Sequence, residues 1–149
     1  MIALLDVNVL IALAWPNHVH HQASRDWFRP QRALGWATCP TTHHGFMRVS
    51  SNSRVTPEAR SPQEAALLLR RLTAVEGHIF WPEDSSLLDG KWVPLDRIRT
   101  HLQITDAQLL ALALSRGGCL ATFDRGISRL VPENVSPEQV LRLIPFGAP

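Results

Sequence analysis

The sequence predicts a single α/β domain over residues 1–149, in which helices cover both faces of a parallel sheet of four to five strands. Short apolar runs alternate with helical patterns along the whole chain, which is typical of strand–helix–strand units. The runs are apolar at consecutive positions, as expected for strands buried on both faces. Hydrophobic residues make up 45% of the chain and charged residues 19%, a composition typical of soluble globular proteins.

The first half of the chain is expected to hold two strands and three helices. The apolar run "IALLD" predicts the first strand, and Pro16 limits the helix that follows it. In the second helix Ala23 and Trp27 recur at helical spacing, and we expect this helix to end by Pro30. A polar loop follows the third helix. The expected elements are, in order, a strand at 2–6, a helix at 8–15, a helix at 18–30, a strand at 33–39, a helix at 41–49 and a loop at 50–57.

The second half repeats this alternation and begins with a strong helix start. Ser61 is expected to cap a helix that has Pro62 at its first position and Glu64 three residues after the cap. A later helix is expected to be capped by Thr105 and ended by Gly117 and Gly118. The expected elements are a helix at 62–75, a strand at 77–82, a short helix and loop over 83–96, a helix within 104–118, a strand at 119–124, a short fifth strand at 133–135 and a helix at 136–144.

Three aspartates occupy comparable places in this pattern. Asp6 ends the first strand, Asp124 ends the fourth, and Asp106 lies in the first turn of the helix that leads into the fourth strand. Ligands of open parallel sheets bind outside the carboxyl ends of the strands, so the three side chains are candidates for one site. Taken singly, Asp106 is also explained as a helix-start acid and Asp124 as a turn residue. Asp6 has no such local explanation, whereas Asn8 is a candidate cap for the first helix.

A cluster of three carboxylates has a definite chemistry. The groups repel one another and raise each other's pKa values unless a cation lies among them. A set of oxygen ligands suits Mg²⁺ or Mn²⁺. The natural reaction of such a site is phosphodiester hydrolysis, in which the ion activates a water molecule. Attack by water predicts products with a 5′-phosphate and a 3′-hydroxyl.

Four motifs together resemble the PIN-domain family, and in particular its VapC-type toxins. They are "LLDVNVLIAL", "TTHHGFMRVSSN", "TDAQLLALA" and "ATFDRGI", and they keep the family's order over nearly the whole chain. The resemblance implies an α/β/α sandwich and a Mg²⁺- or Mn²⁺-dependent endoribonuclease. It also implies the toxin of a type II toxin–antitoxin pair, a small cognate antitoxin that blocks the active site, and a homodimer.

By this resemblance, Asp6, Asp106 and Asp124 are the metal-binding catalytic residues. His43, in "TTHHGF", stands where family members often carry a glutamate. Its imidazole is acceptable to Mn²⁺ but a poor ligand for Mg²⁺. The alternatives are that His43 handles a proton, contacts RNA, or is a neutral replacement. The departure raises a second hypothesis, a degenerate PIN domain that binds RNA or antitoxin with little or no cleavage.

Further candidates are Asn8, Arg48, Thr122 and Arg125. Arg48 and Arg125 could each bind a phosphate. An ion pair or simple exposure to solvent explains each of them equally well. Thr122 either supports the site or simply fills its strand. A zinc site at the histidines around His18 is not favoured, because no third ligand stands at a recognised spacing.

Composition limits the remaining classes of function. The net charge of +2 permits an RNA partner without requiring one, and no apolar stretch is long enough to span a membrane. With no convincing signal peptide, the expected location is the cytoplasm. Cys39 and Cys119 are expected to be buried thiols. A haloacid-dehalogenase-like phosphatase is disfavoured, because Asn8 stands where that chemistry needs a second acid. The RNA that is cut, the number of metal ions and the antitoxin are not specified by the sequence.

Overall fold

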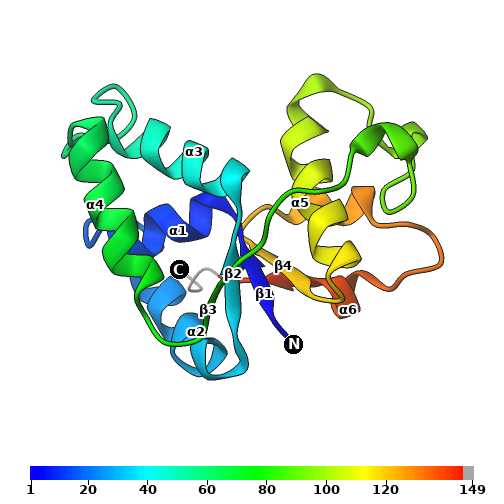
Figure 1. Cartoon of the computed structure of the whole chain (residues 1–149), viewed down its shortest axis with the longest axis horizontal. Coiled ribbons are helices and arrows are strands. Elements are labelled where there is room, and N and C mark those ends of the chain that lie inside the picture. The colour runs from blue at the N-terminus through cyan, green and yellow to red at the C-terminus, as the bar shows by residue number, and fades with distance from the viewer. Residues whose placement is uncertain (146–149) are drawn as a thin grey trace.

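The computed structural model of the chain describes residues 1–145, which form a five-stranded sheet between layers of helices (Figure 1). All four neighbouring strand pairs are parallel, and the strand order is β3-β2-β1-β4-β5. The predicted α/β class is therefore confirmed. The strands are β1 (Ala3–Leu5), β2 (Trp36–Thr38), β3 (His78–Phe80), β4 (Cys119–Thr122) and β5 (Leu141–Leu143).

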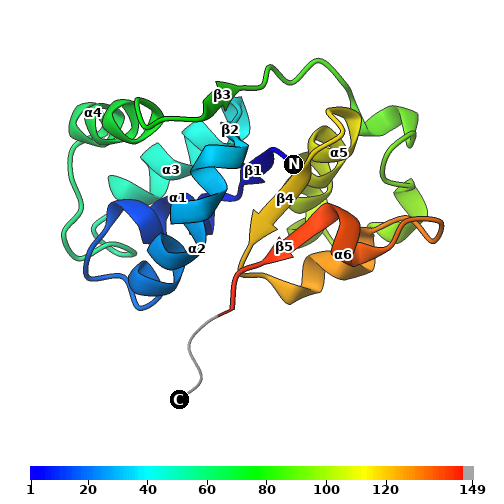
Figure 2. The same cartoon turned by 90° about the horizontal axis from the view of Figure 1, so that it is seen from below.

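The helices are divided between the two sides of the sheet (Figures 1 and 2). One layer consists of α1 (Val7–Ala14), α2 (His21–Leu34), α3 (Pro40–Ser50) and α4 (Pro62–Thr73). The other contains α5 (Ile104–Ser115), α6 (Pro137–Val140) and the 3₁₀ turns η1 (Leu87–Asp89), η2 (Leu95–Arg97), η3 (His101–Gln103) and η4 (Arg125–Leu130).

The strands supply one core to each helical layer because successive side chains point to opposite faces. Leu4 and Leu120 belong to the core that contains α5. Leu5 and Ala121 belong to the core that contains α1. These four side chains have no exposed surface, so the apolar runs do mark strands buried on both faces. The expected α/β/α sandwich is the architecture observed.

The order in which strands are added to the sheet reverses at β1, and this reversal positions the candidate functional site. From β1 the chain passes to β2 and β3 on one side, then returns to add β4 and β5 on the other. The crevice at the carboxyl ends of β1 and β4 lies at this switch point, where ligands of such sheets bind. The backbone N–H of Asp6 donates to the carbonyl of Ala121 at 2.9 Å, which joins the ends of the two strands.

Two expectations for the first half of the chain were wrong. Asp6, not Asn8, is the N-cap of α1: its Oδ1 accepts the N–H of Val7 at 2.6 Å. An aspartate at this place therefore does have a local structural role. Helix α2 continues through Pro30 to Leu34 and ends at Gly35, whose φ of +101° a side chain would disfavour. Pro30 is exposed, so its ring adds no steric conflict with the core.

The second half matches the expectation at its helix start and departs from it near its end. The reciprocal bonds between Ser61 and Glu64 confirm the predicted capping box of α4. Thr105 is not a cap, because α5 begins one residue earlier, at Ile104. No strand forms at 133–135. The fifth strand lies at Leu141–Leu143, inside the segment expected to be helical, and only Pro137–Val140 are helical.

Two smaller expectations concern the cysteines and the membrane. Cys39 and Cys119 are both free and buried, as expected. Over residues 1–145 there is no helix with the length and apolar character that a membrane crossing requires.

Candidate active site

Asp6 is held in place by two hydrogen bonds at the point where β1 becomes α1. One carboxylate oxygen accepts the backbone N–H of Val7, and the other accepts the hydroxyl of Thr122 at 2.7 Å. Only 8% of the residue's surface is exposed. The strand ends at this point because Asp6 caps the next helix.

Thr122, the last residue of β4, connects three polar groups of this region. Its hydroxyl donates to Asp6 and accepts from the Asn8 amide at 3.3 Å and from the backbone N–H of Asp124 at 3.0 Å. Thr122 is fully buried, so these bonds are shielded from water. Thr122 therefore fixes the relative positions of Asp6 and Asp124 and is more than a strand filler.

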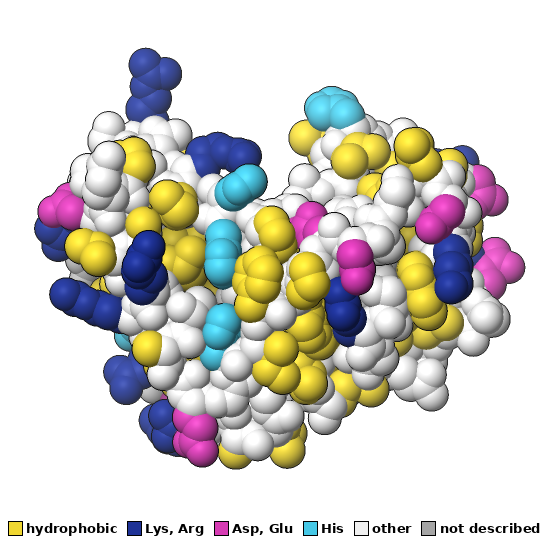
Figure 3. Space-filling view, in the orientation of Figure 1, with side chains coloured by type: hydrophobic (Ala, Val, Ile, Leu, Met, Phe, Trp, Pro, Cys, Tyr) yellow, Lys and Arg dark blue, Asp and Glu magenta, His cyan; other side chains and the backbone are white. Residues whose placement is uncertain are grey.

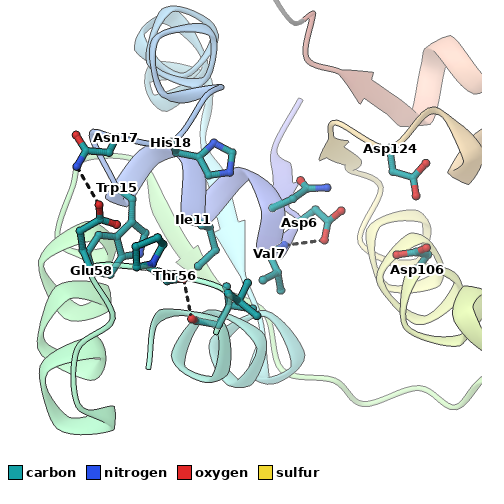
Figure 4. A pocket seen from close by; sticks show the side chains of 14 residues that line it. Asp6, Val7, Ile11, Trp15, Asn17, His18, Thr56, Glu58, Asp106 and Asp124 are labelled. Atoms are coloured by element: carbon teal, nitrogen blue, oxygen red, sulfur yellow. Dashed lines mark hydrogen bonds between the residues drawn. The ribbon is translucent and has the colours of Figure 1, made fainter. Parts of the chain in front are cut away.

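The other two aspartates reach the same crevice from separate elements. Asp124 follows β4, is exposed, and is fixed by the N–H of Gly126, which it accepts at 2.7 Å. Asp106 lies in the first turn of α5 and is half-buried. Figure 4 shows Asp6, Asp106 and Asp124 around one end of a cleft. Asp6 and Asp124 are more than a hundred positions apart in the sequence. All three aspartates nevertheless meet at one edge of the sheet.

The electrostatics are those of crowded carboxylates. Burial raises the pKa of Asp6, the hydrogen bonds from Thr122 and Val7 oppose this, and the charge of Asp124 raises it further. Burial also raises the pKa of Asp106 to about 6, and the charges of Asp6 and Asp124 add to that effect. The site therefore holds more negative charge than its surroundings stabilise.

The polar atoms around the aspartates fit a hydrated hard cation. The side-chain oxygen of Asn8 is buried and has no hydrogen-bond partner within residues 1–145, and it stands beside carboxylates that repel one another. In the same residues, no three His, Cys, Asp or Glu side chains are close enough together to hold one ion directly. Mg²⁺ keeps several waters and commonly meets one or two carboxylates, so a wider carboxylate spacing suits it.

The cleft is larger than the aspartate site. It has a volume of about 590 Å³ and continues from the carboxylates along α1, α3 and the loop before α4. Its walls there are formed by Ile11, Trp15, Val49, Val55, Thr56 and Pro57, which we call the apolar arm. Asn17 and Glu58 lie at its far end, and His18 lies between Asn17 and the aspartates (Figure 4). Trp15 is fixed by a hydrogen bond from its indole N–H to Ser50 at 3.1 Å.

The side chain of His43 makes its contacts on the β2–β3 side of the sheet. Its Nε2 is 2.7 Å from the hydroxyl of Thr38, which is also 2.8 Å from Nε2 of His78. Burial, together with the charge of His44, lowers the pKa of His43. Figure 3 shows a row of histidine side chains down the middle of the view, where Figure 1 draws β2 and β3. The structure does not place His43 among the residues that line the cleft.

The two candidate arginines are also outside the cleft lining. Arg48 is exposed on α3, and Arg125 is exposed at the start of η4, next to Asp124. Sequence reasoning missed Asn17, Glu58 and the walls of the apolar arm. The segment 50–57 gave only the signal of a polar loop, and nothing in its composition indicates that it folds against α1.

Several known proteins are similar in sequence to this chain. The sequence pattern of the PIN domain matches residues 3–131. The chain is 48% identical over 143 residues to ribonuclease VapC38 of Mycobacterium tuberculosis, an alignment that covers 95% of this chain and 99% of the relative. It is 47% identical over 128 residues to ribonuclease VapC39 of the same species, covering 86% of this chain and 92% of the relative. Ribonuclease VapC44, also from that species, is 44% identical over 128 residues, covering 86% and 89%.

Proposed function

The chain belongs to the PIN-domain family, and from that premise we propose that it is a metal-dependent endoribonuclease, the toxin of a type II toxin–antitoxin pair. The observation that carries the proposal is the meeting of Asp6, Asp106 and Asp124 in one cleft at the switch point of the sheet. The relatives in which 44–48% of aligned residues are identical bear the name ribonuclease. RNA hydrolysis is the reaction that both facts support.

Asp6, Asp106 and Asp124, with the buried oxygen of Asn8 beside them, would hold the cation in part through its bound waters. A bound Mg²⁺ or Mn²⁺ supplies positive charge for the phosphate and lowers the pKa of water. Thr122 keeps Asp6 and Asp124 oriented through its hydrogen bonds. Asp106, whose pKa is raised to about 6, is ionised at neutral pH and adds the charge that attracts the cation.

Water rather than the RNA 2′-hydroxyl is the nucleophile in this proposal, so the products carry a 5′-phosphate and a 3′-hydroxyl. A single 2′-deoxynucleotide at the cut site is therefore expected to leave cleavage within about threefold of the all-RNA rate. Mass spectrometry of the products from matched oligonucleotides measures this directly. A 2′,3′-cyclic phosphate product, lost on the deoxy substrate, contradicts the proposed reaction.

The alternative function is a degenerate PIN domain that binds RNA or antitoxin without efficient cleavage. His43 is the residue that favours it. The side chain of His43 bonds to Thr38, however, and does not line the cleft that holds the three aspartates. Its substitution therefore leaves the carboxylate trio intact, and we favour the active enzyme.

The partners that we propose are an RNA substrate, a small cognate antitoxin and a second copy of the chain in a homodimer, all in the cytoplasm. Each follows from membership of the family rather than from a contact within this chain. Size-exclusion chromatography with light scattering measures the oligomeric state, and co-purification with the product of a neighbouring small reading frame tests the antitoxin.

The experiment that tests the function compares RNA cleavage by purified protein in Mg²⁺, in Mn²⁺ and in a chelator. Metal-dependent products are expected from the native chain and from Asp96→Asn, which changes an exposed aspartate outside the cleft. Asp6→Asn and Asp106→Asn are expected to lower the cleavage rate at least a hundredfold while the circular dichroism spectrum stays native. Absence of metal-dependent products from total cellular RNA favours the binding function instead.

A further inference from the structure

The cleft contains more space than a phosphodiester and its cation need. Its volume of about 590 Å³ falls in the range of roughly 300–1,000 Å³ that holds small organic ligands. The aspartates occupy one end, and the apolar arm with Asn17 and Glu58 occupies the other (Figure 4). A group bound in the arm can therefore belong to the same RNA molecule as the phosphodiester at the carboxylates, while it lies at a different place in the cleft.

The charge of the lining restricts what this group can be. Asp6, Asp106, Asp124 and Glu58 line the cleft, and within residues 1–145 no lysine or arginine does. His18 also lines the cleft, but burial lowers the pKa of its ring, so at neutral pH a second phosphate meets no cationic partner in the arm and the backbone of the RNA does not follow it. The walls, which include Ile11, Val49 and Val55, suit an uncharged group with apolar faces. A nucleobase has that chemistry, since its faces are apolar and its polar atoms lie at its edge.

The far end of the arm presents hydrogen-bond acceptors. The Asn17 amide donates to one carboxylate oxygen of Glu58 at 3.2 Å. That bond leaves the Asn17 carbonyl oxygen and the second Glu58 oxygen as two acceptors for a ligand, and the second Asn17 amide N–H as a donor. His18 also lines the cleft, and its Nδ1 accepts the backbone N–H of His20 at 3.1 Å, which leaves Nε2 as a further donor. A base that enters the arm therefore needs two adjacent donors to match the two acceptors, with an acceptor beside them.

We propose that the apolar arm binds one unpaired nucleobase next to the scissile phosphate and that Glu58 and Asn17 favour guanine there over uracil; this inference rests on the proposed ribonuclease function. Guanine presents N1–H and the N2 amino group side by side, which matches two acceptors. Uracil presents a single N–H between two carbonyl oxygens, which repel the same acceptors. The base must be unstacked and unpaired to enter, because a paired base has its edge occupied.

The test uses four matched oligoribonucleotides that differ only at the base beside the cut, namely guanine, inosine, uracil and an abasic ribose. A charge-assisted hydrogen bond corresponds to discrimination on the order of tenfold. The native enzyme with Mn²⁺ is expected to cut the guanine strand about tenfold faster, by kcat/KM, than the uracil strand. The inosine strand lacks the N2 amino group and is expected to lie between them. The abasic strand is expected to be the slowest or equal to the uracil strand.

Two variants probe the arm without touching the aspartates. Glu58→Gln replaces an exposed carboxylate with an amide and is expected to reduce the preference for guanine over uracil to below threefold. Val55→Asp places a charge on a wall residue that is 61% exposed, and is expected to slow cleavage of the guanine strand at least tenfold. Leu88→Asp, which adds the same charge at a residue 86% exposed and outside the cleft, is the matched control and should change neither quantity by more than twofold.

Hydrolysis of bis-(p-nitrophenyl) phosphate, which has no nucleobase, reports on whether the carboxylate site cleaves a phosphodiester. Leu88→Asp, which lies outside the cleft, is expected to retain it within twofold of the native rate. If the native protein hydrolyses neither this compound nor RNA, the proposed function itself fails. If it hydrolyses both, but cuts the guanine, uracil and abasic strands equally fast, the base site is refuted while the function stands.

A second readout does not need turnover. 2-Aminopurine at the same position is expected to brighten when the oligonucleotide binds the slow Asp106→Asn variant, because the base leaves its stacked neighbours. Val55→Asp combined with Asp106→Asn is expected to abolish this signal. If instead Val55→Asp leaves RNA cleavage unchanged and relieves inhibition by the antitoxin, the arm holds a protein side chain and the inference is overturned.

Discussion

Replacing Asp106 with asparagine is expected to stabilise the metal-free protein while it removes activity. In the native chain, burial and then the charges of Asp6 and Asp124 raise the pKa of Asp106 from 3.8 to about 6. A raised carboxyl pKa means that the folded state disfavours the charged form. The cost is therefore fully present above pH 6, declines as the pH falls through 6 and is absent below about pH 4.

The magnitude follows from the size of that rise. At about 1.4 kcal/mol per pKa unit, the upper bound is about 3 kcal/mol. Asp106 is only half-buried, so solvent screening lowers the expected value to about 1 kcal/mol. For a domain of this length, that corresponds to a rise in Tm of about 2–4 °C. Asp96→Asn, at an exposed site, is expected to shift the free energy of unfolding by less than about 0.5 kcal/mol.

Thermal and urea denaturation in a chelator at pH 7.5 and at pH 4 measure this effect. The Asp106→Asn variant should be the more stable protein at pH 7.5, and the two should be equal at pH 4. Added Mn²⁺ should then stabilise the native chain more than the variant, because binding to the folded state alone raises stability. A variant that is less stable than the native chain in chelator at pH 7.5 would refute the argument that the carboxylates repel one another.

Two further predictions concern Thr122 and two glycines. Thr122→Val is expected to lower the free energy of unfolding by about 1–3 kcal/mol, because Asp6 and the N–H of Asp124 lose a buried hydrogen-bond partner. The same variant is expected to lower the cleavage rate at least tenfold. Thr122→Ser, which keeps the hydroxyl, should restore most of the stability and most of the rate. Gly77→Ala should cost at least about 2 kcal/mol, because φ is +83° and the added carbon would lie 1.9 Å from the Arg32 carbonyl oxygen. At Gly117, with φ of +63° and open space, alanine should cost only about 1 kcal/mol. Urea denaturation separates the two glycines, and equal losses would contradict the steric argument.

The sequence was sufficient where structure depends on neighbours along the chain. Ser61, Pro62 and Glu64 specify a helix start by themselves, and the structure has it. Consecutive apolar residues such as Leu4 and Leu5 predicted strands buried on both faces, since both faces of each strand must avoid water.

The sequence was insufficient where contacts between residues distant in the chain determine the local structure. The strand Leu141–Leu143 is defined by its pairing with β4, Leu120 opposite Leu141, and its own residues looked helical. The direction of the His43 side chain depends on Thr38, which lies on another element. The apolar arm exists only because residues 55–58 fold back over α1. No hydrophobic pattern in the sequence predicts this contact.

The dual role of Asp6 has a practical consequence for anyone who needs an inert copy of the toxin. Its carboxylate both begins α1 and faces the crevice, so truncating it to alanine removes a helix cap worth about 1 kcal/mol along with any chemistry. A cell that survives such an allele has lost two things at once, and genetics cannot tell them apart. Asp106 caps no helix, since α5 begins after Gln103. It is the better position for a decoy meant to capture uncut RNA or to titrate the antitoxin in living cells.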